Sequence, residues 1–563
     1  MKTEKLSKIL ACALALAIAL APLSASADRL RQNGNVWDGS IAGSFAGGSG
    51  TEADPFLISD GSELALLAET VNGGDECGGF CFALTEDIVL NDTADFENWS
   101  ENYRPENFWH PIGGSAYSFR GSFDGRGHTV SGMFACATNG TKLGLFGSAE
   151  DTVIRDLSVI RSCVLGNSDA VGGIIGAAEG VYIIGCGFEG TVCGTRSVGG
   201  ICGSAGCCYI TDCSAQVNIS AFQYAGGIVG IAGVTALSGC ETSGTIDAND
   251  RAGGMIGYAL VGCSAVNCLN GAAIDCDEYA GGIAGLGHNT EVSYCENLAD
   301  ITAERYTGGI FGLCCGSSAD HCANRGDISG EYYIGGMIGW ADDGADFGQT
   351  GAYDTVNCCS NSGRVSGEWG VGGIAGDAHF LMVTDSFNTG LITAEQYAGG
   401  LIGYAKDTSA SRCYNVGRVR GDNSGALFGR NTAENVTAEN VYYLDRACAG
   451  GDAFGTGERD GLFCSEEGYE GFDFGGVWFI DPETYYPYAQ IIGMPDGPAL
   501  PESSGDINGD GIATVSDAVA ALRAAMGIMA LSPEEILRGD TDLDGRITVA
   551  DAVAALRAAM GNA

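Results

Sequence analysis

Short apolar runs separated by glycine recur along most of the chain. The pattern Gly-Gly-aliphatic-x-Gly returns about every 27 residues, and shortened copies lie at residues 144–147 and 425–429. The glycine pairs begin at residues 172, 199, 226, 253, 281, 308, 335, 372 and 399. Each period holds a second short apolar segment, as at residues 244–246. Segments of this length are too short for helices and indicate strands separated by turns.

The repeat predicts a mainly β fold. Three or so short strands per period are typical of one coil of a parallel β-solenoid, in which each strand pairs with the coils above and below it at about 4.8 Å. We expect the solenoid over residues 141–430, an N-terminal cap region over 28–140 and a C-terminal cap over 431–493. The interval between Gly339 and Gly372 carries about ten extra residues. A solenoid can carry such an insertion as a loop without breaking the stack.

A cysteine recurs once in almost every coil. It lies at residues 186, 213, 240, 268, 295, 322, 359 and 413, with Ser386 and Leu157 at the same place in two coils. We expect an inward ladder of buried thiols, because stacked strands hold neighbouring Cβ atoms at about 4.8 Å while a disulfide needs about 3.8 Å. Metal binding and local disulfides, for example at Cys207 and Cys208, remain the alternatives.

The repeats resemble the GLUG motif of bacterial surface proteins. The resemblance rests on residues 224–230 (Tyr-Ala-Gly-Gly-Ile-Val-Gly), followed by Cys240 and residues 244–246, and it covers roughly residues 140–430. Residues 54–58, 62–68 and 123–130 resemble the N-terminal cap of that family, and residues 62–68 are expected to be helical. The resemblance implies a secreted or cell-surface solenoid.

Composition and charge narrow the classes of partner. The chain has 92 glycines but only 10 prolines, which excludes collagen and favours many tight turns. Lys and Arg total 27 against 71 Asp and Glu, giving a formal net charge of −44. Such a field repels phosphate backbones and anionic lipid headgroups, so nucleic acid and membrane surfaces are unlikely partners.

The first 27 residues predict export. Lysines at positions 2, 5 and 8 precede an apolar run over residues 9–20, and Ala-Ser-Ala at 25–27 offers a cleavage site. This is the pattern of a secretory signal peptide, and no later stretch approaches the ~20 apolar residues of a membrane span. We therefore expect a secreted protein, extracellular or held at the cell surface through a scaffold.

Two columns of side chains precede the glycine pairs and form a candidate ligand platform. One holds carboxylates and the other holds tyrosines: Asp277, Glu304, Glu331, Glu368 and Glu395, and Tyr224, Tyr279, Tyr306, Tyr333 and Tyr397. Aromatic rings beside acids can bind polysaccharide or host glycans, because sugar faces stack on rings and acids accept hydroxyl hydrogen bonds. In the alternative reading the tyrosines cover a corner of the coil and the acids are solvated turn residues.

Catalysis by the solenoid is a further alternative. A β-helix polysaccharide lyase or glycoside hydrolase needs acidic residues, calcium and a basic residue converging in one groove, which the sequence does not show. The five histidines are scattered and have no zinc-ligand spacing. A non-catalytic adhesin or spacer is the third possibility.

Two copies of a twelve-residue unit, 34 residues apart, predict two calcium sites near the C-terminus. Oxygen ligands at positions 1, 3, 5, 9 and 12, a backbone carbonyl at 7 and glycine at 6 suit Ca²⁺. The expected ligands are Asp506, Asn508, Asp510, Ile512 (carbonyl), Thr514 and Asp517 for one ion, and Asp540, Asp542, Asp544, Arg546 (carbonyl), Thr548 and Asp551 for the other.

Each loop runs directly into a helix-forming segment, and no helix of EF-hand length precedes the first loop. With Asp at position 12, this duplication resembles type I dockerins, over residues 505–563 after a linker at 494–504. The resemblance implies docking onto the cohesin domain of a scaffold protein, through Val515, Ser516 and Arg523 in the first copy and Val549, Ala550 and Arg557 in the second. The expected protein is thus a secreted component of a cellulosome-like assembly, with a solenoid that binds carbohydrate or another surface ligand in polysaccharide catabolism.

Overall fold

The computed structural model describes most of the chain up to residue 444 and parts of the rest. The described residues are 36–137, 142–342, 344, 353–431, 435–444, 455–458, 466–474, 476–480, 490–491, 507, 514–526, 529, 531, 547, 552, 555, 556 and 559. The predicted signal peptide therefore lies outside them. Within them, no helix is long and apolar enough to cross a membrane. The chain divides into two compact units, Met1–Asp275 and Cys276–Ala563.

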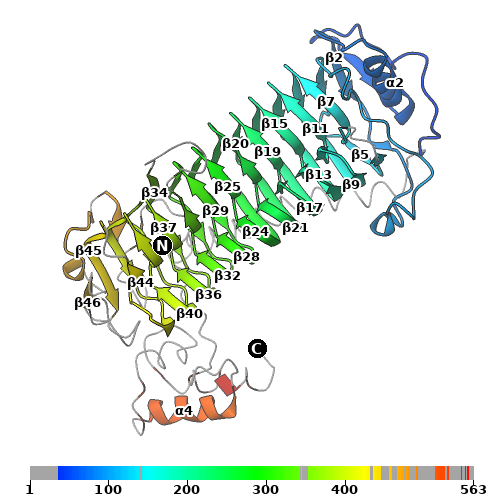
Figure 1. The fold of residues 1–563 in the computed structure, drawn as a ribbon. Helices are drawn as coiled ribbons and strands as arrows, with labels where there is room; N and C mark the ends of the chain where they lie inside the picture. Colours follow the sequence, from blue (N-terminus) through cyan, green and yellow to red (C-terminus); the bar gives the residue numbers. More distant parts are fainter. Residues whose placement is uncertain are drawn as a thin grey trace. The chain divides into compact units, whose positions relative to one another are not determined.

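The first unit is a parallel β-solenoid built from columns of short strands (Figure 1). One column begins with β1 (Phe56–Ile58), β2 (Cys81–Leu84) and β4 (Ser122–Asp124) and continues with β8 (Val153–Arg155), β12 (Tyr182–Ile184), β16 (Tyr209–Thr211), β20 (Ala236–Ser238) and β23 (Ser264–Val266). A second holds β3 (Ile88–Val89), β5 (Thr129–Ser131), β6 (Phe134–Ala137), β9 (Ser158–Gly166), β13 (Gly187–Gly194), β17 (Ser214–Ala221) and β21 (Glu241–Gly253).

Two further columns complete the coils of this unit. The glycine pairs follow or end β10 (Ala170–Gly172), β14 (Ser197–Gly199), β18 (Ala225–Gly226) and β21, and the residues after them form β7 (Phe146–Glu150), β11 (Ile175–Glu179), β15 (Cys202–Gly206), β19 (Val229–Gly233) and β22 (Ile256–Ala259). Partners are 27 residues apart, as in Gly172 with Gly199. The predicted parallel β-solenoid is confirmed.

Helix α2 (Gly61–Asn72) lies between the first two strands. The Asp60 carboxylate accepts hydrogen bonds from the backbone N–H groups of Ser62 and Glu63 and so caps the helix N-terminus. Leu64, Leu67 and Val71, spaced three and four residues apart, are buried. The predicted helix at 62–68 is confirmed and is longer than expected.

The second unit has the same coil plan. One column holds β26 (Glu291–Ser293), β30 (Ser318–Asp320), β34 (Asp354–Asn357), β38 (Leu381–Thr384), β42 (Ser409–Asn415), β45 (Thr437–Leu444) and β46 (Thr456–Glu458). A second holds β27 (Glu296–Asn297), β31 (Ala323–Asn324), β35 (Ser360–Asn361) and β39 (Phe387–Asn388), and a third holds β28 (Ile301–Gly308), β32 (Ile328–Gly335), β36 (Val365–Gly372), β40 (Ile392–Gly399) and β43 (Val419–Asp422). The fourth holds β25 (Ala284–His288), β29 (Phe311–Cys315), β33 (Ile338–Ala341), β37 (Ala375–His379), β41 (Ile402–Lys406) and β44 (Phe428–Asn431). Strand β24 (Leu269–Gly281) contains the boundary between the units.

The insertion after Gly339 leaves the pairing intact. Partners in β26 and β30 are 27 residues apart, as in Glu291 with Ser318, while Ser318 pairs with Thr355, 37 residues on. The difference, 37 − 27 = 10, equals the expected insertion. The strand pairing therefore continues in register across the insertion; the expected loop falls mainly on residues outside the described ones.

Two ladders fill the core of the coils. The ladder cysteines are all buried, with Ser386 and Leu157 at the equivalent places, so their predicted inward position is confirmed. All 21 described cysteines are free thiols. Burial raises the pKa of Cys413 to about 12. These thiols therefore act as small apolar side chains and weak donors, as when Cys413 Sγ donates to Val383 O over 3.6 Å.

The second ladder, of asparagines, was not predicted. Asn297, Asn324, Asn361, Asn388 and Asn415 are fully buried in the second unit. Each Nδ2 donates to the Oδ1 of the next asparagine, from Asn297 to Asn324 and onward to Asn415, over 2.7 to 2.8 Å. Each also donates to a backbone carbonyl two residues on, as Asn361 does to Gly363 O at 2.9 Å. The ladder thereby satisfies turn carbonyls that would otherwise be buried without donors.

The remaining described elements lie near the end of the chain. Tyr414, Tyr442, Tyr469 and Trp478 belong to one apolar cluster, and Trp478 Nε1 donates to Asp385 Oδ1 over 2.9 Å. The turn η3 (Glu466–Gly468) and the antiparallel pair β47 (Trp478–Phe479) and β48 (Gln490–Ile491) belong to this region. Helix α4 (Val515–Ala525) begins at position 10 of the first predicted calcium loop.

Candidate functional site

The five predicted tyrosines occupy a corner of the coil with an unusual backbone. Tyr224, Tyr279, Tyr306, Tyr333 and Tyr397 all have positive φ, between 52° and 62°. In the second unit Tyr279 stacks on Tyr306 with ring centroids 4.8 Å apart, and Tyr306 stacks on Tyr333 at 5.5 Å, with interplanar angles of 10° and 3°. Neighbouring rings thus cover one another's faces. Sugar rings would reach mainly the edges and hydroxyls of this column.

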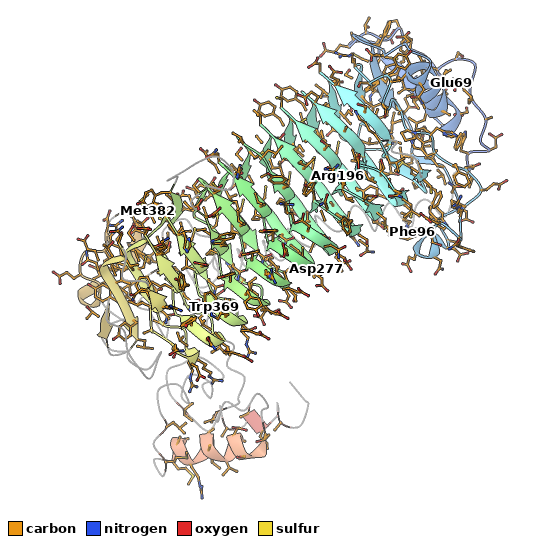
Figure 2. All side chains as sticks on the ribbon, in the orientation of Figure 1. Glu69, Phe96, Arg196, Asp277, Trp369 and Met382 are labelled. Carbon is orange, nitrogen blue, oxygen red and sulfur yellow. The ribbon has the colours of Figure 1, made fainter. Side chains whose placement is uncertain are left out.

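A second row of aromatic side chains packs against the tyrosines and was missed in the sequence. Trp340 stacks on Tyr306 at 5.0 Å, and Tyr404 stacks on Trp369 at 5.6 Å. Trp369 meets Tyr333 edge-on at 5.1 Å and 83°. Figure 2 shows Trp369 on the same side of this unit as Asp277. The signal was the residue after the last glycine of the motif, since Trp340 follows Gly339 and Tyr404 follows Gly403.

The five predicted carboxylates, Asp277, Glu304, Glu331, Glu368 and Glu395, are all exposed. The neighbouring Glu278 makes an ion pair with Arg305, with Oε1 and Nη1 3.6 Å apart. Arg305 also lies over the ring of Tyr332, 5.8 Å from its centroid. The acids are therefore solvated, as in the second reading of these columns, but they lie within strands β24, β28, β32, β36 and β40 and not in turns.

Two buried carboxyl groups lie in the coils of the second unit, and one of them, Asp377, adjoins this corner. Asp377 pairs in register with Trp340 and Tyr404, and its Oδ1 is 3.3 Å from His379 Nε2. Burial raises its pKa to about 7, with Asp342 adding to the shift. Asp354 is fully buried, and burial raises its pKa to about 8 even though Ser317 N donates to its Oδ1 over 2.7 Å. Both groups therefore take up protons in the neutral range.

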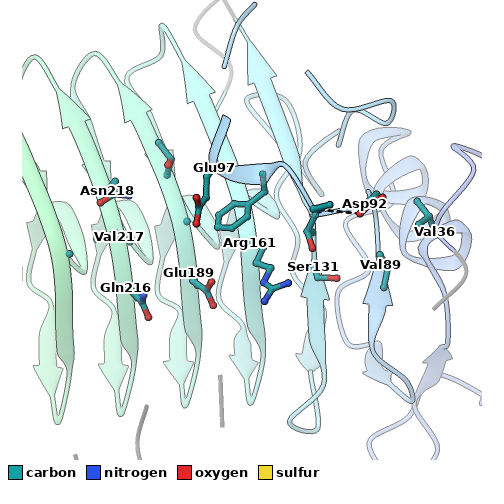
Figure 3. Close-up of a pocket in the computed structure, with 16 residues that line it drawn as sticks. Val36, Val89, Asp92, Glu97, Ser131, Arg161, Glu189, Gln216, Val217 and Asn218 are labelled. Carbon is teal, nitrogen blue, oxygen red and sulfur yellow. Dashed lines mark hydrogen bonds between the residues drawn. The ribbon is translucent and has the colours of Figure 1, made fainter. Parts of the chain in front are cut away.

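A polar groove lies in the first unit (Figure 3). Its volume is about 930 Å³. Arg161 of β9 and Glu189 of β13 project from adjoining strands, and the segment around η1 (Phe96–Asn98) supplies Phe96 and Glu97. Burial raises the pKa of Glu189, while the charge of Arg161 opposes that shift. Sequence analysis missed these residues, because no repeated pattern links residues 92–97 to the coils.

Only two of the twelve expected calcium ligands lie within the described part of the chain. The carboxylate of Asp517 is buried, at 1% exposure, and its Oδ2 accepts hydrogen bonds from Thr514 N at 2.9 Å and Thr514 Oγ1 at 2.7 Å. These are positions 12 and 9 of the first loop. These contacts form a capping box at the N-terminus of α4. Asp506, Asn508, Asp510, Ile512, Asp540, Asp542, Asp544, Arg546, Thr548 and Asp551 lie outside the described residues.

The two copies of the unit share an apolar core. Ile507 and Ala521 of the first copy form a buried cluster with Ala552 of the second, and Ile547 packs against it. Ser516 and Arg523, two expected docking residues, are exposed on α4, which begins at Val515. Val549, Ala550 and Arg557 lie outside the described residues.

Comparisons with known proteins place the chain among no established family. No protein-family model matches it. A protein described as a Gly-rich membrane protein of Evansella cellulosilytica is 32% identical over 140 residues, covering 24% of this chain and 15% of that protein. Halomucin of Haloquadratum walsbyi is 30% identical over 149 residues, covering 26% of this chain and 2% of halomucin. The chain thus spans a small part of the length of both relatives.

One solved structure aligns over much of the chain. It is a protein described as an immunoglobulin A1 protease of Bacteroides ovatus, and the alignment covers 80% of this chain and 98% of that one. The sequence identity is 15% and the TM-score is 0.22. At that score the likeness carries no argument about function.

Proposed function

We propose that this protein is an exported component of a cellulosome-like assembly, with GLUG-like coils and a C-terminal dockerin-like module. The module would bind two calcium ions and dock onto the cohesin domain of a scaffold protein. The observation that carries this proposal is the buried Asp517 carboxylate beside the Thr514 hydroxyl, at two positions of a duplicated oxygen-rich loop. The apolar core shared by the two copies supports a single folded module.

Calcium would supply the positive charge that lets several carboxylates approach one another in each loop. Asp517 is already held by Thr514, and its helix presents the exposed Ser516 and Arg523. The protein's own residues thus orient the loop and display the docking face. The near-identity of the two helices, residues 518–527 and 552–561, suits a module that docks in two orientations.

The docking proposal is tested by calorimetry and by capture. We expect two calcium ions to bind the full chain and a panel of scaffold cohesins to capture it in calcium but not in chelator. The double variant Asp517→Asn and Asp551→Asn should lose capture, while Asp212→Asn, which alters an exposed carboxylate in the solenoid, should retain it. No heat on titrating calcium into the full chain would refute the proposal.

For the solenoid, we propose binding of polysaccharide along the groove of Arg161 and Glu189. The groove is long, polar and lined by an aromatic ring, and Gln216 and Asn218 extend its row of hydrogen-bonding side chains onto the next coil. Extended sugar chains need this combination of polar contacts and apolar faces. The tyrosine column supports the proposal less, because its ring faces are already covered.

Affinity gels with plant and mucin polysaccharides test this part. Arg161→Asn keeps a residue that tolerates the positive φ of 47° at this position and removes the guanidinium. We expect it, like Glu189→Gln, to restore the mobility that the wild-type chain loses. The control variant Tyr182→Ser alters an exposed ring away from the groove. Unaltered mobility of the wild-type chain in every gel would refute polysaccharide binding.

The groove also favours one second candidate, a β-helix polysaccharide lyase. Arg161 converges there with Glu189, Glu97 and Asp92, which is the combination of base and acids that such an enzyme requires. Incubation with polyuronates in calcium, followed by the absorbance of unsaturated sugar ends, distinguishes the two. An equal absence of product with the wild-type chain and Arg161→Asn would leave binding as the function.

A further inference from the structure

A cluster of Asp320, His321 and Cys358 lies at another corner of the coils in the second unit. One ligand atom from each of the three residues lies within 4.8 Å of those of the other two. His321 and Cys358 occupy the same corner position on neighbouring coils, with φ of 51° and 52°, and His321 N donates to Asn357 O over 3.1 Å. The pairing of the coils therefore sets the separation of imidazole and thiol.

The carboxylate of Asp320 is held in place by a chain of hydrogen bonds. Asn357 Nδ2 donates to Asp320 Oδ1 over 2.7 Å, and Thr384 Oγ1 donates to Asn357 Oδ1 over 2.6 Å. The other oxygen, Oδ2, is 2.9 Å from His321 Nδ1. Outer hydrogen bonds of this kind orient metal ligands in proteins. One oxygen of Asp320 is thus fixed while the other faces the imidazole.

The surroundings hold the remaining members rigid. The ring of Tyr294 stacks on His321 with centroids 4.9 Å apart, and Cys358 is 5% exposed. On the next coil, Asp385 occupies the corner position that His321 and Cys358 hold on theirs. Its carboxylate already accepts hydrogen bonds from Arg412 Nε and Trp478 Nε1, at 2.8 and 2.9 Å. Asp385 is therefore engaged elsewhere, and the candidate ligands are the three residues of the cluster.

We propose that Asp320, His321 and Cys358 bind one zinc ion. A thiolate, an imidazole and a carboxylate are the ligand types that Zn²⁺ takes, whereas Ca²⁺ takes oxygen alone. Three protein ligands leave a fourth tetrahedral position for water. The site lies on the solenoid and is chemically distinct from the oxygen-rich loops at the C-terminus.

Cobalt(II) is the probe, because its thiolate complexes absorb in the near ultraviolet and tetrahedral sites absorb in the visible. The full chain, freed of metal and kept in excess calcium, is titrated with Co²⁺ and then with Zn²⁺. We expect one Co²⁺ per chain with a sulfur charge-transfer band that Zn²⁺ abolishes. Oxygen-only loops give no such band, so failure of the docking proposal would not affect this result.

Matched variants locate the site. Cys358→Ser and His321→Asn should remove the tetrahedral cobalt spectrum, and asparagine already occupies the equivalent corner at Asn267, with φ of 52°. Asn357→Ala should weaken binding about tenfold by freeing Asp320. Two controls should bind normally: Cys359→Ser, because Ser386 is the next member of that ladder, and Cys207→Ser, which removes an exposed thiol.

Two outcomes would overturn the proposal. One is a wild-type chain without a charge-transfer band. The other is a band that persists in Cys358→Ser or disappears in Cys207→Ser. Circular dichroism shows whether each variant folds. If Cys358→Ser does not fold, loss of the cobalt spectrum in His321→Asn decides the test.

Discussion

Gly227 shows at the residue scale why the motif demands two adjacent glycines. A Cβ there would collide with the carbonyl oxygen of Gly254 on the next coil and lie 2.6 Å from Thr242 Cγ2. The obstacle is backbone, so no rotamer change relieves it. The requirement arises from the close approach of two coils rather than from the φ of the glycine.

We expect Gly227→Ala to destabilise the protein by about 1–3 kcal/mol, as overpacking of a rigid core does. Gly233→Ala in the same coil is the control, because the nearest heavy atom to its added Cβ, Leu260 Cδ1, would lie 3.7 Å away. Urea unfolding followed by circular dichroism compares them. Equal midpoints for the two variants would contradict the close-approach argument.

Asp354 gives the protein a dependence on pH at the same scale. Burial raises its pKa from 3.8 to about 8. Between those values the unfolded chain releases this proton while the folded chain keeps it. The free energy of unfolding therefore falls as pH rises from about 4 to about 8, and this contribution is fully present only below the lower value. Asp377, with its pKa raised to about 7, adds a fall that ends near pH 7.

Asp354→Asn keeps an acceptor for Ser317 N and removes the titration. We expect its stability to fall less than that of the wild-type chain between pH 5 and pH 8, about 1.4 kcal/mol less for each pH unit within the window. Asp212→Asn, at an exposed corner, should follow the wild type. Urea midpoints measured across this range decide the matter, and parallel curves for all three chains would contradict the assignment.

At the scale of the element, the asparagine ladder links successive coils of the second unit. Each side chain joins a coil to the next and also satisfies a turn carbonyl within its own coil. Asn361 receives Asn324 Nδ2 and donates to Asn388 Oδ1. Such a chain of buried amides stabilises one pairing register of the coils only, because a shifted coil would leave the amides without hydrogen-bond partners.

Asn361→Ala should cost about 1–3 kcal/mol for each acceptor left unsatisfied in the core. The acceptor at stake is Gly363 O, since Asn388 Oδ1 keeps a second donor in Gly390 N. Thr302→Ala, which removes an exposed hydrogen bond of 2.9 Å to Ser329, should cost less than about 0.5 kcal/mol. Guanidinium unfolding gives both values. A loss for Asn361→Ala no larger than that for the exposed control would show that the ladder does not stabilise the stack.

At the scale of the whole molecule, the solenoid coils and the C-terminal module are stabilised by different interactions. The coils bury apolar side chains and backbone hydrogen bonds between strands, and the described part of the C-terminal copies contributes a buried cluster of Ile507, Ala521 and Ala552. A module this short, with several carboxylates in each loop, is expected to depend on a metal for folding. Removal of calcium should therefore act on one part of the chain and spare the other.

Chelation should abolish the helical circular dichroism of the C-terminal module and leave the β signal of the coils unchanged. Hydrogen exchange read by mass spectrometry would locate the change to residues 505–563. Re-addition of calcium, but not of magnesium, should restore the protection. A chain whose C-terminal exchange is the same with and without chelator would contradict the dependence.

The sequence alone determined the coil. The local signals are glycine pairs about every 27 residues, an aliphatic residue after each pair and a cysteine in register. Almost every coil repeats them, and a parallel stack aligns equivalent positions. Helix α2 was equally predictable from the sequence, since its capping residue Asp60 and the spacing of its apolar residues lie within one short segment. The calcium-loop expectation also rests on local spacing, and it remains a prediction for the ten ligands outside the described residues.

Only the tertiary structure decided which side chains meet. In the second unit an asparagine stands two places after each ladder position, from Cys295 to Cys413, yet nothing in one repeat shows that its amide reaches the next. Stacking turned the tyrosines from an exposed platform into a column whose faces are covered. His321 and Cys358 are far apart in sequence and meet because they stand on neighbouring coils. Glu97 reaches the groove of Arg161 because the η1 segment packs against the coils through Phe96.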